Sequence, residues 1–453
     1  MVMGLIEKIV EKANFFMWEK NILVVMLVGS ALYFTWKTKF IQIRFLKNVG
    51  EILFRKQEEG NDKGITPFQS FCLGTACRVG AGNVVGVVAA ISIGGPGSIF
   101  WMWLVAFLGS STAFVESVLA VIYRDGKGGK YRGGTPWIIE KKTGSKKFAM
   151  LFALSSILCY FGVTQVMANT ITSSLKMSIP SMGNWIAYLL TALTALLLLG
   201  KKDKIIGFLN TLVPIMAGLY LMVSFFIILK NAAYIPGVFR EIVLSAFGIG
   251  EAVGGTVGGA LMLGIKRGLF SNEAGSGNST YAAAVSEVDH PAEQGMVQML
   301  GVFVDTLLIC SATALVILLG KGGEGLTGVA LFQNAMVYHL GWVGKPFVTL
   351  ILFLFSFSTI LGVAFYGKTA LAYFTQKKNG LTVFNLLMIA MVFMGGTGEN
   401  YFVWSLADLG LGLMTIFNLS CIIPLGGEAV AALEEYEAMR GDAVYEKNKS
   451  NLV

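Results

Sequence analysis

Two apolar stretches of this sequence are interrupted by glycine: Gly74–Gly86 (GTACRVGAGNVVG) and Gly248–Gly259 (GIGEAVGGTVGG). Glycine weakens a helix by roughly 1 kcal/mol per residue and lets the backbone approach a ligand closely. Irregular backbone at membrane depth persists only where it is buried in protein or lines a cavity. Such a pair of segments in corresponding halves of a chain indicates the binding site of a secondary transporter. We therefore expect two broken helices that share one site.

The composition places the chain in a membrane. Of its 453 residues, 55% are hydrophobic and 14% are charged, and the mean hydropathy is +0.68. Apolar runs near the ~20 residues that cross a bilayer recur along the sequence, about eleven in all. We therefore expect an all-α integral membrane protein. The expected spans are residues 21–36, 66–92, 98–123, 148–176, 184–200, 205–229, 241–266, 295–320, 345–375, 381–395 and 401–424.

Lysine and arginine follow alternate spans, and short loops rich in these residues stay in the cytoplasm. Every odd-numbered span then ends inside, which puts the N-terminus outside the cell membrane and the C-terminus in the cytoplasm. These loops account for the net charge of +8 and attract anionic lipid. Nucleic-acid binding would need a continuous basic face with interleaved aromatic residues, and the sequence has no such pattern. The loop charges include Lys37, Arg44, Arg55, Arg124, Lys130, Lys141, Lys201, Lys202, Lys266, Arg267, Lys377 and Lys378.

The two ends of the chain have their own expected roles. An amphipathic stretch, Leu5–Lys12, precedes the first span, and no small-residue cleavage site follows it. We interpret it as an interfacial helix and not as a removable signal peptide. The acidic tail from Gly426 is expected to form a short cytoplasmic helix.

Several kinds of chemistry are excluded by residue counts. The chain has only two histidines and five cysteines without a CxxC spacing, so a multi-histidine metal or haem site is excluded. Residues Gly362–Thr369 (GVAFYGKT) match the phosphate-loop pattern, but they close a long apolar run and favour a continuous helix. We expect neither an enzyme nor an organic cofactor.

Charged residues inside expected spans are costly and are therefore functional candidates. They are Arg78, Glu116, Glu251, Asp305 and Asp408. Structural roles compete with functional ones: Arg78 could pair with Asp305 or Glu116 between helices, and Glu116 lies near enough to a cytoplasmic end to be partly solvated. The sequence leaves these alternatives open.

Several motifs resemble those of one transporter family. The run Gly94–Gly109 (GGPGSIFWMWLVAFLG) is similar to the signature of the sodium:alanine/glycine symporters, the AGCS family. The blocks RVGAGNVVG (Arg78–Gly86), KRGLFSNEAG (Lys266–Gly275), HPAEQG (His290–Gly295) and GVFVDTLLIC (Gly301–Cys310) agree with it. Departures occur at Thr135–Trp137 and Asn278–Thr280, which are expected to lie in cytoplasmic loops.

The resemblance implies a LeuT-like core of two inverted five-helix repeats, placed on the second to eleventh spans, with the first span as an addition. It implies four segments: an N-terminal part, two repeats and a tail. Their boundaries are residues 1–65, 66–229, 230–424 and 425–453.

For the substrate, the resemblance implies a small neutral amino acid, alanine and possibly glycine. A broken helix offers free amides at one half-helix end and free carbonyls at the other, which suits a zwitterion without an ion-paired side chain. Gly80, Ala81, Gly82 and Asn83 are expected to hold its carboxylate with backbone and amide contacts. Carbonyls around Gly254, Gly255 and Thr256 are expected to face its ammonium. Gln165, at a position that resembles the pocket-facing helix of the fold, is the candidate polar wall.

For the coupling ion, the resemblance implies sodium, bound as in the commonest sodium site of this fold. Carbonyls near Ala76 and Val79 would meet Ser358 and Thr359, with Phe355 contributing a carbonyl. The alternative is a transporter of the same fold that couples to protons or moves a nucleobase or a larger amino acid. Asp305 would then carry the proton.

Overall fold

The computed structural model describes residues 2–45, 49–55, 64–126, 130–200, 202–249, 256–398 and 401–450. These residues are almost all helical, and the β-pairing among them is limited to isolated bridges such as Ile65 with Ser286. Seven helices in this part of the chain are long and apolar enough to cross a membrane, or nine if each of two bent pairs is one span. The all-α membrane class is confirmed, whereas the number eleven is not.

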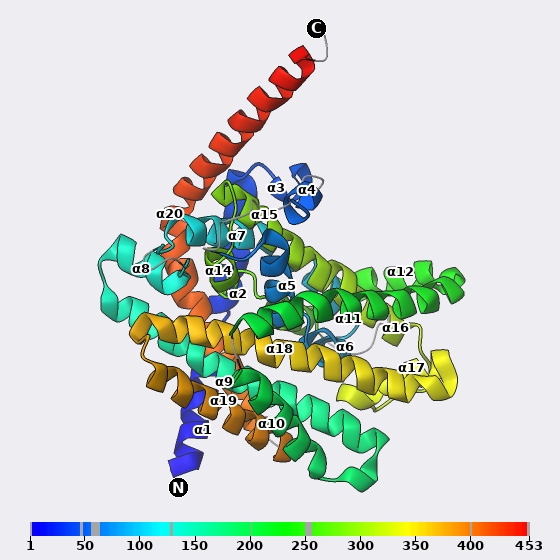
Figure 1. The fold of residues 1–453 in the computed structure, drawn as a ribbon. Helices are drawn as coiled ribbons and strands as arrows, with labels where there is room; N and C mark the ends of the chain where they lie inside the picture. The colour runs from blue at the N-terminus through cyan, green and yellow to red at the C-terminus, as the bar shows by residue number, and fades with distance from the viewer. Residues whose placement is uncertain are drawn as a thin grey trace.

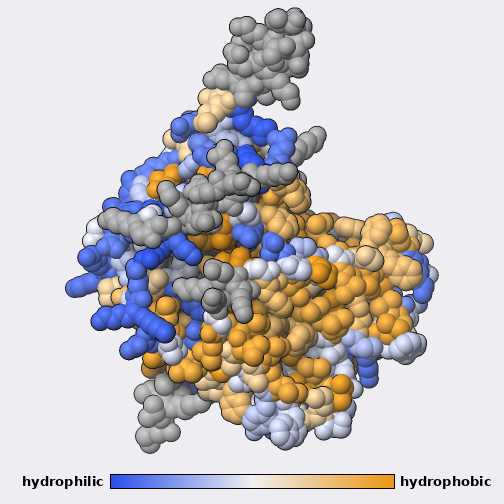
Figure 2. Space-filling view, viewed as in Figure 1, coloured by the Kyte–Doolittle hydropathy of each residue, from blue (hydrophilic) through white to orange (hydrophobic). Residues whose placement is uncertain are grey.

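The helices pack into one bundle with α20 projecting from it (Figure 1). Apolar side chains cover the face over α11, α18 and α17, and hydrophilic ones gather around α8, near the end where α20 leaves (Figure 2). In chain order the helices are α1 (Val2–Asn14), α2 (Ile22–Lys37), α3 (Ile41–Arg44), α4 (Val49–Leu53), α5 (Pro67–Arg78), α6 (Val85–Gly94), α7 (Gly97–Ile122), α8 (Thr135–Thr143), α9 (Lys146–Ser178), α10 (Trp185–Leu198), α11 (Lys202–Lys230), α12 (Ile235–Ala246), α13 (Val257–Asn272), α14 (Ser279–Ala284), α15 (Pro291–Val302), α16 (Ser311–Leu318), α17 (Gly328–Leu340), α18 (Gly344–Phe374), α19 (Lys378–Thr397) and α20 (Tyr401–Ser450).

The first glycine stretch breaks a helix as expected. Helix α5 begins with a capping box, in which the Thr66 side chain accepts from the Gln69 amide and the Gln69 side chain accepts from the Thr66 amide. It ends at Arg78, and a 3₁₀ turn (Ala81–Asn83) leads into α6 at a bend of 59°.

The second glycine stretch lies between two helices, because α12 ends at Ala246 and α13 begins at Val257; its residues 250–255 fall outside the described residues. Residues 257–272 form the continuous helix α13, and the chain leaves helical geometry at Glu273 (φ 58°), followed by positive φ at Gly275 and Gly277. Glu273–Asn278, between α13 and α14, is therefore a further interruption, which the glycine pattern did not predict. Lys266 and Arg267, expected in a loop, lie inside α13.

These two basic side chains are held within the protein. Lys266 Nζ lies 2.8 Å from Asp408 Oδ2 in α20, and the Arg267 guanidinium lies 5.1 Å from the ring centroid of Trp404. An ion pair and a cation–π contact make a basic residue tolerable at this depth. The prediction that these two residues lie in a cytoplasmic loop was therefore wrong.

Two other expectations concern helix continuity. Gly362–Thr369 lies inside the continuous helix α18, so the match to the phosphate loop is fortuitous. Helix α20 runs without a break past residue 424, with Pro424 inside it, so the expected tail begins within a helix.

Candidate functional site

A small cavity of about 20 Å³ lies where the two interrupted helices meet. Such a volume holds roughly one water, so the site is closed in this conformation. Residues from α9, α18 and α20 complete its walls. The lining is Cys77, Arg78, Gly80, Gly82, Cys159, Tyr160, Val163, Met167, Phe270, Glu273, Asn278, Thr359, Val363 and Leu411.

The first interruption is held in shape by Asn83. Its Oδ1 accepts from the Gly80 amide at 2.9 Å, and its Nδ2 donates to Asp305 Oδ1 at 2.6 Å. The Ala81 amide donates to Met167 Sδ at 3.4 Å. Of the four residues expected to bind a carboxylate, only Gly80 and Gly82 line the cavity. Two of the amides expected to be free already have acceptors, and Asn83 positions the loop.

Asp305 is fully buried in a π-helical segment (Phe303–Cys310) between α15 and α16. Besides Asn83, it accepts from Ser271 Oγ at 2.8 Å and Thr306 Oγ1 at 2.7 Å. All three donors are neutral. Asp305 thus ties the first interruption to α13.

Arg78 pairs with neither of the carboxylates proposed for it. Its Nε donates to the Asn272 carbonyl and its Nη1 to Gln298 Oε1, both at 3.0 Å. Nη2 is buried and has no hydrogen-bond partner among the described residues.

Glu116, in α7, is fully buried, so the expectation of partial solvation was wrong. Its Oε2 accepts from the Gly277 amide at 3.1 Å and from Asn418 Nδ2 at 2.7 Å, and its Oε1 accepts from the Ser279 hydroxyl. Glu116 therefore holds the second interruption.

Glu273 is the site residue that sequence reasoning missed. Its side chain lines the cavity, and the residue is only 7% exposed. Oε1 accepts from Asn278 Nδ2 at 2.9 Å, while Oε2 is buried without a partner among the described residues. The available signal was the cluster NEAGSGN (Asn272–Asn278), because such glycine and asparagine clusters mark a break between apolar helices.

The expected sodium residues do come together. Thr359 Oγ1 donates to the Ala76 carbonyl at 2.9 Å and to the Phe355 carbonyl at 3.0 Å. Ser358 Oγ donates to the Phe355 carbonyl at 2.9 Å, and Val79 is buried at the end of α5. Carbonyl and hydroxyl oxygens of α5 and α18 thus converge beside the cavity.

Of the other expected substrate residues, Thr256 and Gln165 do not line the cavity. Thr256 is exposed and caps α13, accepting from the Gly259 amide at 3.1 Å. Gly254 and Gly255, like Glu251, fall outside the described residues. Gln165 Nε2 donates to Met391 Sδ in α19 at 2.9 Å and does not line the cavity.

Helix geometry explains the displacement of Gln165. Successive residues are rotated by about 100°, so a residue two positions from Val163 faces roughly the opposite side of α9. The cavity face of α9 consists of Cys159, Tyr160, Val163 and Met167. Placing Gln165 on that face was therefore wrong.

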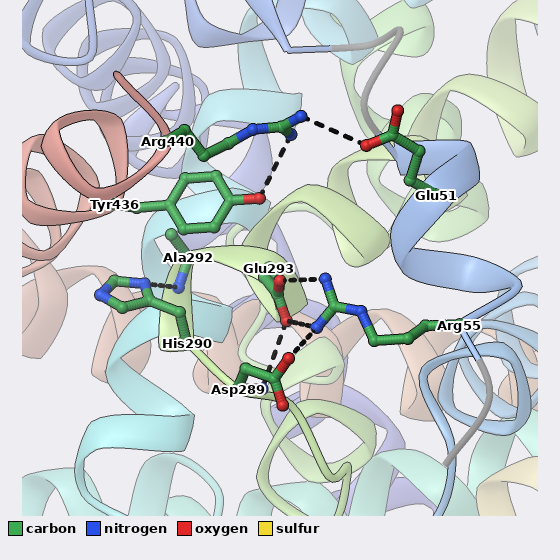
Figure 3. Close-up of polar contacts among 8 residues, drawn as sticks. All are labelled: Glu51, Arg55, Asp289, His290, Ala292, Glu293, Tyr436 and Arg440. Carbon is green, nitrogen blue, oxygen red and sulfur yellow. Dashed lines mark hydrogen bonds and ion pairs between the residues drawn. The ribbon is translucent and has the colours of Figure 1, made fainter. Parts of the chain in front are cut away.

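A second group of polar contacts lies where α4, the start of α15 and α20 meet, and we call it the polar-end cluster (Figure 3). Arg55 donates to both carboxylate oxygens of Glu293, at 2.6 and 3.0 Å, and contacts Asp289. The hydrogen bond to Glu293 raises the pKa of Arg55. His290 caps α15 by accepting from the Ala292 amide at 3.2 Å.

Sequence comparison agrees with the motifs. Residues 3–450 match the family model described as the sodium:alanine symporter family. The probable sodium/glutamine symporter GlnT of Bacillus subtilis is 38% identical, over 95% of this chain and 91% of that protein. The sodium/alanine symporter AgcS of Methanococcus maripaludis is 33% identical, over 95% and 97%.

Structural comparison supports the fold alone. A mutant of the manganese transporter of Eremococcus coleocola superposes with a TM-score of 0.52 at 14% identity, over 83% of this chain and 81% of that one. This likeness is consistent with a LeuT-like fold. The family match and the symporter relatives identify the chain as a multi-pass amino-acid symporter that belongs to the sodium:alanine symporter family.

Proposed function

We propose that the protein uses the sodium gradient to import small neutral amino acids, alanine first and glycine second, by alternating access. The observation that carries the proposal is the position of the Ala76, Phe355 and Thr359 oxygens beside a cavity formed by two interrupted helices. Substrate and ion would then bind next to the same pair of interrupted helices, so that the binding of one affects the binding of the other.

The walls favour a short side chain. Val163, Met167 and Phe270 border the cavity, and a Cβ on Gly82 would lie 3.2 Å from Phe270 Cδ1. The closed cavity must expand even for alanine, because its volume is that of about one water. Each further methylene of a substrate would require more displacement of these walls.

The coupling ion suits the oxygen ligands. Sodium needs several oxygens and no thiolate or imidazole, and carbonyls and hydroxyls from α5 and α18 supply them. One sodium ion carries roughly 2.3 kcal/mol per 100 mV and about 1.4 kcal/mol per tenfold gradient. Their sum supports accumulation of several hundredfold without ATP.

The proposed setting is the plasma membrane, with the N-terminus outside and the C-terminus inside. The inverted repeats would occupy residues 66–229 and 230–424, so that α5–α6 and α13–α14 are equivalent broken helices. The polar-end cluster and the basic loops beside it would then face the cytoplasm.

Proton coupling is the second candidate. A relative in Bacillus subtilis, 35% identical over 95% of this chain, is named a putative sodium/proton-dependent alanine carrier protein, and Asp305 is a buried carboxylate beside the site. Asp305→Asn would abolish proton-driven uptake and its pH dependence if Asp305 carries the proton, whereas an Asp305 that only anchors the loop would give slower uptake with an unchanged pH dependence.

The deciding experiment is uptake of labelled alanine into liposomes that contain only this protein. An inward sodium gradient should drive accumulation above equilibrium, and potassium at equal ionic strength should not. Accumulation under a proton gradient alone would overturn the sodium assignment. Absence of alanine and glycine uptake under both gradients would overturn the substrate.

A further inference from the structure

Two side chains of opposite charge line the cavity, and each has one polar atom without a hydrogen-bond partner among the described residues. Glu273 Oε2 and Arg78 Nη2 are both buried without a hydrogen-bond partner in the described part of the chain. The two residues form no ion pair with one another there, although both line the same cavity. A buried charge without a full set of partners is costly, and a bound ligand of opposite charge would remove that cost.

We propose that Glu273 and Arg78 bind the two charged groups of the substrate: Glu273 Oε2 accepts from its ammonium, and Arg78 Nη2 donates to its carboxylate. This inference rests on the proposed function and specifies how that site recognises an α-amino acid. It differs from the recognition expected from the sequence, in which backbone groups and the neutral side chains of Asn83 and Gln165 met the substrate and no charged side chain took part.

The remaining contacts hold both groups ready for a ligand. Asn278 Nδ2 donates to Glu273 Oε1, and Asn278 Oδ1 accepts from the Tyr160 hydroxyl at 2.6 Å. Arg78 is fixed by the Asn272 carbonyl and Gln298. Each side chain thus keeps one free atom while its other polar atoms are fixed, which is the preorganisation that a binding site requires.

The neighbouring acids are already occupied. Asp305 accepts from Asn83, Ser271 and Thr306. Glu116 accepts from Gly277, Ser279 and Asn418. Neither lines the cavity, so Glu273 is the carboxylate placed to meet an ammonium there.

Glu273 also has an unusual backbone. Its φ of 58° and ψ of 10° are in the left-handed region, which costs free energy for a residue other than glycine. Glycine would relieve this strain and remove the carboxylate. A strained residue whose side chain enters a cavity is typical of a functional position.

The first test is competition against labelled alanine on the wild-type symporter in detergent with saturating sodium. Lactate has a hydroxyl where alanine has an ammonium, and alaninamide lacks the carboxylate. Each should compete at least 100-fold more weakly than alanine. Competition by lactate within tenfold of alanine would overturn the role of Glu273, and the same result with alaninamide would overturn that of Arg78.

The second test uses Glu273→Gln, which keeps the shape and removes the charge. Alanine affinity should fall at least 50-fold, and the preference for alanine over lactate should narrow at least tenfold, an effect that loss of packing would not produce. Sodium-induced thermal stabilisation should persist and serves as the folding control. If folded Glu273→Gln binds alanine as tightly as the wild type, the role of Glu273 is wrong. If the wild-type protein neither binds nor transports alanine, the proposed function is wrong instead.

Discussion

The two interrupted helices solve the same problem with different means. At the first, the loop between α5 and α6 turns on Gly80 and Gly82, and Asp305 holds it indirectly through the Asn83 side chain. At the second, the loop between α13 and α14 turns on Gly275 and Gly277, and Glu116 holds it by accepting directly from its backbone.

The comparison indicates why buried carboxylates occur here at all. A broken helix leaves amide groups without intrahelical acceptors, and a membrane offers no water to replace them. Each break is therefore tied to a carboxylate on a continuous neighbouring segment, Asp305 for the first and Glu116 for the second. We infer that Asp305 and Glu116, two of the charges singled out as functional candidates, act mainly as anchors, and that the carboxylate meeting the substrate, Glu273, lies in the second loop itself.

Removing the Glu116 carboxylate, which binds the second loop directly, should lower stability more than any other change. In Glu116→Ala, the Gly277 amide, the Asn418 amide and the Ser279 hydroxyl lose their acceptor in a buried place. The free energy of unfolding should fall by about 3 kcal/mol or more, because each buried unsatisfied group costs about 1–3 kcal/mol. Thermal unfolding in detergent measures it. Glu116→Gln keeps an acceptor oxygen and should lose less than half as much; equal losses in the two variants would contradict the anchoring role.

At the first interruption, the close approach of the backbone should make a methyl group intolerable. A Cβ on Gly80 would lie 2.4 Å from Thr359 Oγ1, whereas a Cβ on Gly258 would meet nothing within 4 Å. Gly80→Ala should lower the initial rate of sodium-driven alanine uptake about 100-fold, the cost of a clash of roughly 2–3 kcal/mol. Gly258→Ala, at the start of α13 in the second glycine stretch, should keep uptake within twofold. Equal loss in both variants would contradict a special role for the close backbone approach at Gly80.

The sodium assignment concerns α18 and the first interruption. Thr359→Val removes the hydroxyl that joins the Ala76 and Phe355 carbonyls without changing the shape. The sodium concentration for half-maximal uptake should rise about tenfold, equivalent to one lost ligand contact of about 1.4 kcal/mol. The control is Ser356→Ala in the same helix, which removes a buried hydroxyl that has no hydrogen-bond partner among the described residues. It should change the half-maximal sodium concentration less than twofold. An unchanged sodium dependence in Thr359→Val would place the ion elsewhere.

The interruption between α5 and α6 was predicted and the one between α13 and α14 was not, and the difference has a physical reason. The first was predictable because its glycines interrupt an otherwise apolar run, and such a pattern is local. The second depends on Lys266 and Arg267, which resemble loop charges until Asp408 and Trp404 are placed beside them. Those partners are more than a hundred residues away in the chain, and no periodicity in the sequence connects them.

The misplacement of Gln165 has a similar cause. Helix α9 packs against α18, α19 and α20 but has apolar residues on its exposed side as well, so its hydrophobic pattern does not identify the face toward the cavity. The prediction that the sodium residues of α5 and α18 lie beside one another was correct. It came from the family resemblance, which pairs these two helices, and a single sequence does not supply that pairing. Whether they bind sodium stays a prediction.

The polar-end cluster should give the smallest effect, because it lies at the start of α15, away from both interruptions. Arg55 is 40% exposed at its side chain, and its partner Glu293 is 3% exposed. Arg55→Gln removes its ion pair with Glu293, and only Glu293 of this pair is buried. The free energy of unfolding should therefore fall by about 1 kcal/mol and the rate of uptake about twofold. The difference from wild type should shrink at 0.5 M salt, since exposed charges are screened, whereas the losses in Glu116→Ala should not. Thermal unfolding of both variants across a salt series measures this contrast, and a salt-independent loss in Arg55→Gln would mean that the cluster acts as a buried anchor like the other two.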